Sequence, residues 1–160
     1  MADIRQTGDV RDTKDDAIPL GDFLCFAVYS AGHAFNRVYK PLLAPLGLTY
    51  TQYLAMVALW ERDGRTVGEL GETLGLESST LTPMIKRLEA MGHVVRARDP
   101  NDERQVRVRL TEEGRALREK ARDIPRCILE ASGLTLDDLR RLQRDISALT
   151  RALERHSGAV

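Results

Sequence analysis

The stretch from residue 66 to residue 91 constrains the fold more than any other part of this 160-residue chain. Thr66-Val67-Gly68-Glu69 has the spacing of a capping box, in which two side chains satisfy backbone N–H groups at a helix start. Gly75 can adopt the left-handed conformation that ends this short helix. The inward apolar residues of the two successive helices are Val67, Leu70 and Leu74, then Leu81, Ile85, Leu88 and Met91. Two short helices joined by a brief glycine-containing turn predict a helix-turn-helix.

A β-hairpin is predicted directly after the second of these helices. Gly92 ends the helix, and residues 93–99 and 104–110 read as two strands around the turn-forming loop 100–103. The second strand alternates strictly, with Val106, Val108 and Leu110 inward and Gln105, Arg107 and Arg109 outward. A hairpin at this place is the wing of a winged helix.

Helical patterns flank this segment on both sides. A first helix is expected from about residue 19 to about residue 40, interrupted by Pro41 and Pro45. Residues 49–52 have capping-box spacing and open a second helix that ends near residue 63.

The C-terminal third predicts two further helical stretches. Thr111 should cap a helix that runs at least to Asp123, and the Ile124-Pro125 step should kink or break it. Thr135 has the start-signal spacing for the last helix, whose apolar residues form a heptad-like seam: Leu139, Leu142, Ile146, Leu149 and Leu153. The seam is compatible with ordinary core, but together with the apolar first helix it favours a homodimer interface.

The distribution of charge is more informative than its sum. The net charge of zero argues weakly against a nucleic-acid partner. Residues 84–110, however, carry seven basic and four acidic side chains, a local excess of three positive charges where a winged helix reads DNA. Charge alone fits a solvated surface equally well, and some winged helices serve as protein-interaction modules.

The residues predicted to contact double-stranded DNA lie on the second helix and the hairpin. Short hydroxyls at the helix start suit base edges, basic residues one turn later suit phosphates or guanines, and an arginine at the hairpin tip suits a narrow minor groove. The predicted set is Ser78, Ser79, Thr80, Thr82, Pro83, Lys86, Arg87, Arg96, Arg98, Asp102 and Arg104.

The overall prediction is an α-rich α+β fold, a winged helix-turn-helix whose N- and C-terminal helices form a homodimer interface. We expect residues 1–17 to be a disordered arm and residues 18–160 to be a single winged-helix domain. Within it we expect a DNA-reading lobe at about 51–111 and dimerisation helices at about 18–45 and 112–156.

Several classes of protein are disfavoured by what the sequence lacks. No apolar run approaches the roughly 18 residues of a membrane helix, and the polar N-terminus has no signal-peptide core, so we expect a cytoplasmic protein with no membrane partner. Cys25 and Cys127 have no metal-binding spacing, and neither do His33, His93 and His156. No phosphate-binding loop or dinucleotide fingerprint appears, so no cofactor is expected.

The stretch from Leu24 to Arg118 resembles the MarR family of winged-helix regulators, and within it the organic-hydroperoxide-sensing, OhrR-type branch. The wing and exit residues that carry the resemblance are Asp102-Glu103-Arg104 and Leu110-Thr111-Glu112-Glu113-Gly114. The branch is indicated by Leu24-Cys25-Phe26, Tyr39-Lys40-Pro41-Leu42-Leu43, Leu48-Thr49-Tyr50-Thr51-Gln52-Tyr53-Leu54-Ala55 and Thr80-Leu81-Thr82-Pro83-Met84. The resemblance implies a repressor that leaves a palindromic operator when an organic hydroperoxide acts on it.

The resemblance also implies roles for the thiol and three tyrosines. Cys25 would be the peroxide-sensing residue, with Tyr29, Tyr39 and Tyr50 hydrogen-bonding around it. Spacing adds an independent point: Tyr39 lies 14 residues after Cys25, a rise of about 21 Å on a continuous helix. Tyr39 can therefore meet only the Cys25 of a second subunit, which predicts a sensor site shared across a two-fold dimer.

The residues next to Cys25 do not by themselves make it reactive. Asp22 would raise a thiol pKa, the helix start would lower it, and no Lys or Arg lies within one turn. Without the resemblance, a buried packing cysteine is the more natural interpretation. Cys127 is interpreted as a resolving thiol that traps the oxidised Cys25 as a disulfide, and the alternative is an incidental cysteine.

The sequence is also compatible with two other functions. One is a MarR-type regulator released by a small aromatic ligand in the dimer crevice, with Cys25 a bystander. The other is an enzyme, a thiol peroxidase, which is disfavoured because Cys25 has no obvious catalytic arginine or acid partner while a DNA-reading module is present. We therefore do not expect an enzyme.

Overall fold

The computed structural model describes residues 18–157, and the predicted N-terminal arm lies outside them. The chain divides into two compact units between Phe35 and Asn36. In the first unit, a 3₁₀ turn (η1, Leu20–Asp22) precedes the start of helix α1 (Leu24–Leu43). Large apolar side chains stay exposed along this unit: Ile18, Leu20, Phe23, Leu24, Phe26, Val28, Tyr29 and Phe35.

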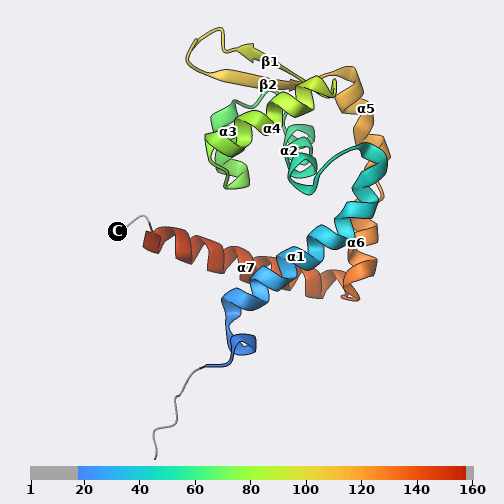
Figure 1. The fold of residues 1–160 in the computed structure, drawn as a ribbon, viewed down its shortest axis with the longest axis vertical. Coiled ribbons are helices and arrows are strands. Elements are labelled where there is room, and N and C mark those ends of the chain that lie inside the picture. The colour runs from blue at the N-terminus through green and yellow to red at the C-terminus, as the bar shows by residue number, and fades with distance from the viewer. Residues whose placement is uncertain (1–17, 158–160) are drawn as a thin grey trace, which may run out of the picture. The chain divides into compact units, whose positions relative to one another are not determined.

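The second unit contains the end of α1 and all later elements (Figure 1). These are η2 (Ala44–Leu46), α2 (Tyr50–Glu61), α3 (Val67–Leu74), α4 (Ser78–Ala90), β1 (Val94–Arg98), β2 (Val106–Leu110), α5 (Glu112–Lys120), α6 (Ile124–Ser132) and α7 (Leu136–Ser157). The fold is therefore mostly helical with one small antiparallel sheet, as predicted.

The core of the second unit lies between α2, α4 and the hairpin. Its fully buried large side chains are Leu43, Met56, Leu59, Leu70, Leu81, Ile85, Leu88, Val94 and Val108. Burial of apolar surface of this kind is the main favourable term in folding. Helix α4 contributes only its inward face to this core, so its other face remains available.

The hairpin pairs in the predicted alternating register, with Val94 opposite Leu110 and Arg96 opposite Val108. Its strands are one or two residues shorter than expected at the loop. A third backbone segment, not predicted from the sequence, joins the hairpin: the Val108 N–H donates to the Arg65 carbonyl at 2.8 Å. Thr66 also forms an isolated antiparallel bridge with Arg107. The loop before α3 thus fixes the hairpin on the helices.

Three helix boundaries differ from the prediction. Helix α1 begins at Leu24 and continues through Pro41 to Leu43. A proline there costs one hydrogen bond only two residues before the helix ends, so it does not stop the helix. Helix α5 ends at Lys120, short of the predicted Asp123, and α6 starts at Ile124. The break at the Ile124-Pro125 step is confirmed.

Pro83 lies inside helix α4, as its sixth residue. It therefore removes the bond that would reach the Ser79 carbonyl.

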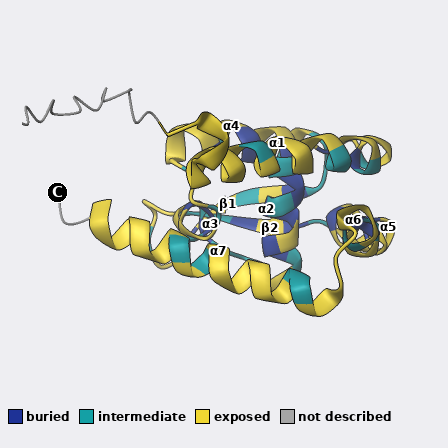
Figure 2. Ribbon diagram, turned by 90° about the horizontal axis from the view of Figure 1, so that it is seen from below, coloured by how far each residue is buried: buried dark blue, intermediate teal, exposed yellow. Residues whose placement is uncertain are grey.

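Helix α7 starts where the sequence predicted. The Thr135 hydroxyl accepts from the Asp138 N–H at 3.2 Å and donates to the Asp138 carboxylate at 2.6 Å. No residue of α7 is buried, and Figure 2 shows the helix mostly exposed, with a few half-buried stretches. Leu142, Ile146 and Leu153 of the predicted seam are 46%, 42% and 62% exposed. Within the described chain the seam is therefore not core.

Candidate nucleic-acid interface

Helices α3 and α4 are held by strong local signals. Thr66 and Glu69 form the predicted capping box: the Glu69 carboxylate accepts from the Thr66 N–H at 2.7 Å, and the Thr66 hydroxyl accepts from the Glu69 N–H at 3.1 Å. The first of these backbone bonds lowers the pKa of Glu69, with a further contribution from Arg62. Gly75 ends α3 with φ of 63°, a conformation that side chains disfavour. These features turn the chain sharply into α4.

Helix α4 presents a polar face to solvent. The opposite face is buried through Leu81, Met84, Ile85 and Leu88. The residues predicted to read DNA lie on the outer face: Ser78, Ser79, Thr80, Pro83, Lys86 and Arg87 are exposed, and Thr82 is half-buried. No carboxylate of residues 18–157 lies within ion-pairing distance of Lys86 or Arg87. Both cations are thus available to an anionic partner.

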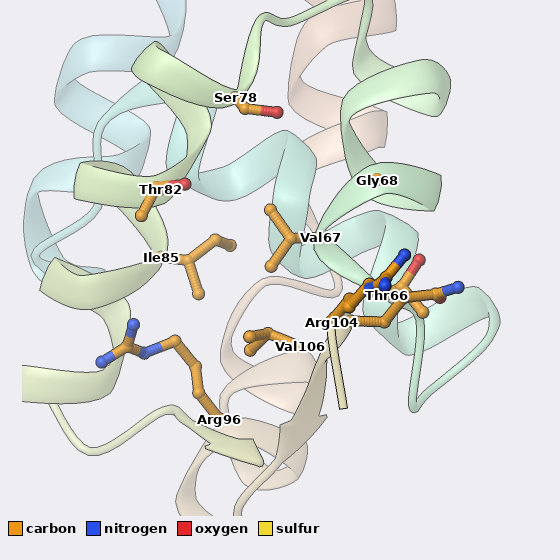
Figure 3. A pocket seen from close by; sticks show the side chains of 10 residues that line it. Thr66, Val67, Gly68, Ser78, Thr82, Ile85, Arg96, Arg104 and Val106 are labelled. Carbon is orange, nitrogen blue, oxygen red and sulfur yellow. The ribbon is translucent and has the colours of Figure 1, made fainter. Parts of the chain in front are cut away.

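A groove of about 380 Å³ separates α4 from the hairpin (Figure 3). Its lining residues are Thr66, Val67, Gly68, Ser78, Thr82, Ile85, Arg96, Arg104, Gln105 and Val106. Predicted contacts from the helix and from the hairpin therefore face one surface. The sequence did not single out Thr66, Gly68 or Gln105 for this surface, because their place depends on the loop before α3 docking against the hairpin.

Two of the hairpin arginines differ in how they are held. Arg96 donates from Nε to Glu89 at 2.8 Å, and its backbone N–H donates to the same carboxylate at 2.9 Å. These bonds lower the pKa of Glu89. The Arg104 side chain is exposed and has no carboxylate within reach among the described residues. Arg104, near the hairpin tip, is thus the less committed of the two, and the exposed Arg98 is similarly unpaired within residues 18–157.

Two aspartates shape the hairpin rather than offering charge to a partner. The buried Asp99 accepts from the Asn101 N–H at 2.8 Å and pairs with Arg107. The Asn101 bond, and then Arg107, hold the pKa of Asp99 below its usual value. Arg107 also donates to the Gly64 carbonyl at 2.7 Å, so its predicted outward orientation is only partly met. Asp102 accepts from the backbone N–H of Arg104 at 3.0 Å and orders the tip.

The segment that leaves the hairpin is anchored by backbone contacts. The Thr111 hydroxyl donates to the Gly92 carbonyl at 2.6 Å and accepts from the Gly114 N–H at 2.9 Å. A Cβ atom on Gly114 would overlap the carbonyl oxygen of His93. Within residues 110–114, which resemble the family's exit signature, these contacts explain why a hydroxyl residue stands at Thr111 and a glycine at Gly114.

Cys25 and Tyr29 belong to the first unit. Cys25 is the second residue of α1 and is exposed. Tyr29, one turn later, is 62% exposed, and its ring meets that of His33 edge-on, with centroids 4.4 Å apart. The alternative interpretation of Cys25 as a buried packing cysteine does not hold in the single chain, where its side chain is exposed.

Tyr39 and Tyr50 belong to the second unit and lie together. Their ring centroids are 4.5 Å apart, and that of Tyr53 is 5.8 Å from Tyr39. Desolvation, followed by the neighbouring tyrosines, raises the pKa of Tyr39 to about 12. The sequence did not predict Tyr53 as a member of this tyrosine cluster. Its spacing of three residues from Tyr50 on one helix face is the signal that would have revealed it.

The second cysteine, Cys127, is half-buried in α6, and both cysteines are free thiols.

Within residues 18–157 no group of three His, Cys, Asp or Glu side chains could hold a metal ion. In the same range no single helix is long and apolar enough to cross a membrane, and one bent pair, 24–46 with 50–61, passes only by combined length and composition.

The helix-turn-helix, the hairpin and the groove between them define a winged-helix protein. The family model described as transcriptional regulator SarA/Rot matches residues 37–121, over half of the chain. A MarR-family transcriptional regulator from Rhodococcus has a TM-score of 0.74 at 26% identity, covering 81% of this chain and 94% of its own. The chain belongs to the SarA/Rot- and MarR-type winged-helix transcriptional regulators, which confirms the resemblance found in the sequence.

Three relatives are more similar in sequence. TtmR of Methylorubrum extorquens is 48% identical over 147 residues, 92% of this chain and 75% of that protein. The organic hydroperoxide resistance transcriptional regulator of Bacillus subtilis is 44% identical over 142 residues, 89% of this chain and 97% of that protein. AbfR is a protein of Staphylococcus epidermidis. The structure of reduced AbfR bound to DNA has a TM-score of 0.73 at 34% identity, and the match covers 85% of this chain and 93% of the AbfR chain. AbfR has also been solved in overoxidised and disulfide-formed states.

Proposed function

We propose that this regulator is a homodimeric repressor that leaves a palindromic operator when an organic hydroperoxide oxidises Cys25. The observation that carries the proposal is an exposed thiol at the start of α1 in a chain that is 44% identical, across nearly the whole length, to the B. subtilis hydroperoxide resistance regulator. Because the partner is DNA, the proposed place of action is the cytoplasm, where thiols are kept reduced.

The proposed DNA contacts follow from the free face of α4 and the groove beside it. A helix fits the major groove, and the residues near its N-terminus reach base edges. Ser78, Ser79, Thr80 and Thr82 would meet bases there, and Lys86 and Arg87 would meet phosphates. Arg104 would enter the adjacent minor groove. DNA binding by AbfR, a structural relative, supports this assignment.

The proposed dimer interface uses the exposed apolar faces of α1 and α7. Exposed apolar patches of this extent are unusual on monomers and mark interaction surfaces. Phe26 on α1 and Ile146 on α7 are 36% and 42% exposed in the single chain. A two-fold dimer would cover them and would place two copies of α4 at a fixed separation, which a palindromic operator requires.

The proposed sensor is shared between subunits. Cys25 and Tyr39 lie on the same helix, α1, and 14 residues of helix correspond to a rise of about 21 Å. A thiol lined by Tyr39 and Tyr50 would therefore be the partner's Cys25. Tyr29, one turn from Cys25 on the same helix, would be a neighbour from the thiol's own chain.

The proposed chemistry consumes one peroxide per thiol. The Cys25 thiolate attacks one peroxide oxygen, so that an S–O bond forms as the O–O bond breaks. The sulfur is oxidised to a sulfenic acid, and the departing alkoxide takes a proton to become an alcohol. Cys127 then attacks the sulfenic sulfur, forming a disulfide and releasing water. The thiols return only when a reductant opens the disulfide, a requirement that a thiol peroxidase shares. A regulator is proposed because the chain belongs to a family of transcriptional regulators and carries a DNA-reading module.

A second candidate function is favoured by one cavity. A cleft of about 670 Å³ opens between α2 and the α5–α6 junction. Tyr53, Val57, Trp60 and Pro125 give it an apolar and aromatic part, and its charged lining is mixed: Arg118 and Arg122 with Glu61 and Glu119. A small aromatic ligand would suit such a site, in which case the regulator would respond to that ligand with Cys25 a bystander.

One experiment separates these functions. The DNA affinity of wild type, Cys25→Ser and Cys127→Ser is measured before and after cumene hydroperoxide, by fluorescence anisotropy on a duplex selected with the reduced protein. The proposal requires release of wild type and retention of Cys25→Ser. If Cys25→Ser is released as readily as wild type, Cys25 is not the sensor. Salicylate in place of peroxide tests the second candidate.

A further inference from the structure

The first turn of α2 is closed by a reciprocal capping box. The Thr49 hydroxyl accepts from the Gln52 N–H at 3.3 Å, and the Gln52 side-chain oxygen accepts from the Thr49 N–H at 2.9 Å. Gln52 is only 5% exposed. The two bonds tie residues 49–52 into one closed hydrogen-bonded turn, which we call the α2 turn.

One side of the α2 turn belongs to the tyrosine cluster. Tyr50 is the first residue of α2, directly after the capping Thr49. Its ring packs on Tyr39 with centroids 4.5 Å apart. Any displacement of the Tyr50 ring therefore acts on the backbone of the capped turn.

The other side of the α2 turn faces α4, the helix that the proposed function places in the major groove. A groove of about 370 Å³ lies between them. The α2 turn contributes Thr49, Thr51 and Gln52 to its lining, and α4 contributes Ser79, Thr80, Pro83, Met84 and Arg87. Residues 79–87 include the face that the proposed function assigns to DNA. The neighbours of Tyr50 in sequence thus line the same groove as residues expected to touch the operator.

We propose that the α2 turn is the mechanical link from the tyrosine cluster to α4, with Thr49 and Gln52 as its positioning residues. This inference rests on the proposed function. Coupling between two sites requires an element that both sites bias. The α2 turn carries Tyr50 of the tyrosine cluster and lines a groove together with α4. With the capping box closed, residues 49–52 shift together with Tyr50 and transmit the movement to α4. With the box open, the first turn of α2 unwinds locally and the movement does not reach α4.

The test measures a coupling ratio, the Kd of peroxide-treated protein divided by the Kd of reduced protein. Thr49→Val keeps the shape of the side chain and removes the cap, Thr49→Ser keeps the cap, and Gln52→Ala removes the other bond. Thr135→Val is the matched control, because the Thr135 hydroxyl caps α7 in the same way at 3.2 Å. The probe is the duplex selected with reduced wild type, the oxidant is cumene hydroperoxide, and the rate of Cys25 oxidation is followed by thiol titration.

We expect Thr49→Val and Gln52→Ala to lower the coupling ratio by about fivefold or more, within the usual range of allosteric coupling. Cys25 should oxidise at the wild-type rate in both, and Thr49→Ser and Thr135→Val should keep the wild-type ratio. An unchanged ratio in both cap-loss variants overturns the inference. So does an equal loss in Thr135→Val, which would indicate general destabilisation, or a parallel fall in the oxidation rate.

The Cys25→Ser arm reports on the proposed function separately. If peroxide releases Cys25→Ser as it releases wild type, the sensor assignment fails, while the ratios of the Thr49 variants still report whether release passes through the α2 turn. Each variant is first checked for a wild-type thermal unfolding transition. If one cap-loss variant does not fold, the other is used, because Thr49→Val and Gln52→Ala each remove a different one of the two capping bonds.

Discussion

The indole Nε1 of Trp60 donates a hydrogen bond of 2.8 Å to the carbonyl oxygen of Gly114. This bond joins the end of α2 to the start of α5 across 54 positions of sequence. It lies where the hairpin returns to the helices, beside the Thr111 contacts that anchor the same turn. The winged-helix lobe is therefore closed by polar contacts at its exit as well as by its apolar core.

Gly114→Ala should strongly destabilise the protein. The added methyl group would meet the backbone of His93, whose carbonyl carbon lies only 3.0 Å from the ideal Cβ position. Backbone cannot move aside as a flexible side chain can, so we expect a loss of about 2–3 kcal/mol. Urea unfolding followed by circular dichroism measures it. Gly68→Ala, in α3 with its nearest neighbour at 3.8 Å, is the control and should be neutral or stabilising by about 0.5–1 kcal/mol.

Lys86→Ala and Arg104→Ala should each weaken DNA binding without unfolding the protein. Both side chains are exposed and lack a carboxylate partner among residues 18–157. Loss of the proposed phosphate contact in Lys86→Ala should make the dependence of affinity on salt shallower by about one unit of log–log slope. Arg126→Ala, whose side chain pairs with Glu130 on α6 at 3.0 Å, is the control and should keep the wild-type slope. Unchanged affinity in both test variants would refute the placement of the reading face.

Wild type should lose more stability at alkaline pH than Tyr39→Phe. Burial raises the pKa of Tyr39 from 10.0 to about 12, so the folded protein favours the neutral phenol. The stability from this shift is fully present below pH 10 and is lost as the pH rises from 10 towards 12. Chemical denaturation of both proteins between pH 8 and about pH 11.5 measures the difference. Parallel pH profiles would show that Tyr39 is not responsible.

Peroxide should produce a disulfide between Cys25 of one subunit and Cys127 of the other. The thiols lie on different helices, α1 and α6. A disulfide requires α-carbons within about 7 Å. We propose that α1 and α6 move to close the bond and that this movement alters the spacing of the two copies of α4. Non-reducing electrophoresis of oxidised wild type should show a covalent dimer, and Cys127→Ser should not.

Two results would contradict that disulfide. A monomer band containing an internal link would refute the intersubunit version. A Cys25 sulfenic acid that persists in wild type, detected by dimedone labelling and mass spectrometry, would leave Cys127 without a resolving role.

Local chemistry was readable from the sequence because it depends on residues three or four apart. The capping boxes at Thr49 and Thr66, the glycine turn at Gly75 and the helix start at Thr135 all occur as predicted. Their bonds join neighbouring residues, so spacing alone specifies them. The alternation of the second strand likewise predicted the burial of Val108 and Leu110.

Contacts between distant segments were decided only by the tertiary structure. The Arg65–Val108 backbone bond, the Arg107–Gly64 bond and the groove that joins Thr66 to Arg104 depend on how the loop before α3 docks on the hairpin. Nothing in the spacing of these residues encodes that docking, because it arises from packing of the whole core. The sequence by itself determined the winged-helix class and the thiol and tyrosines of interest. The tertiary structure decided which arginines pair with a carboxylate among residues 18–157 and which do not, since pairing depends on partners brought together by folding.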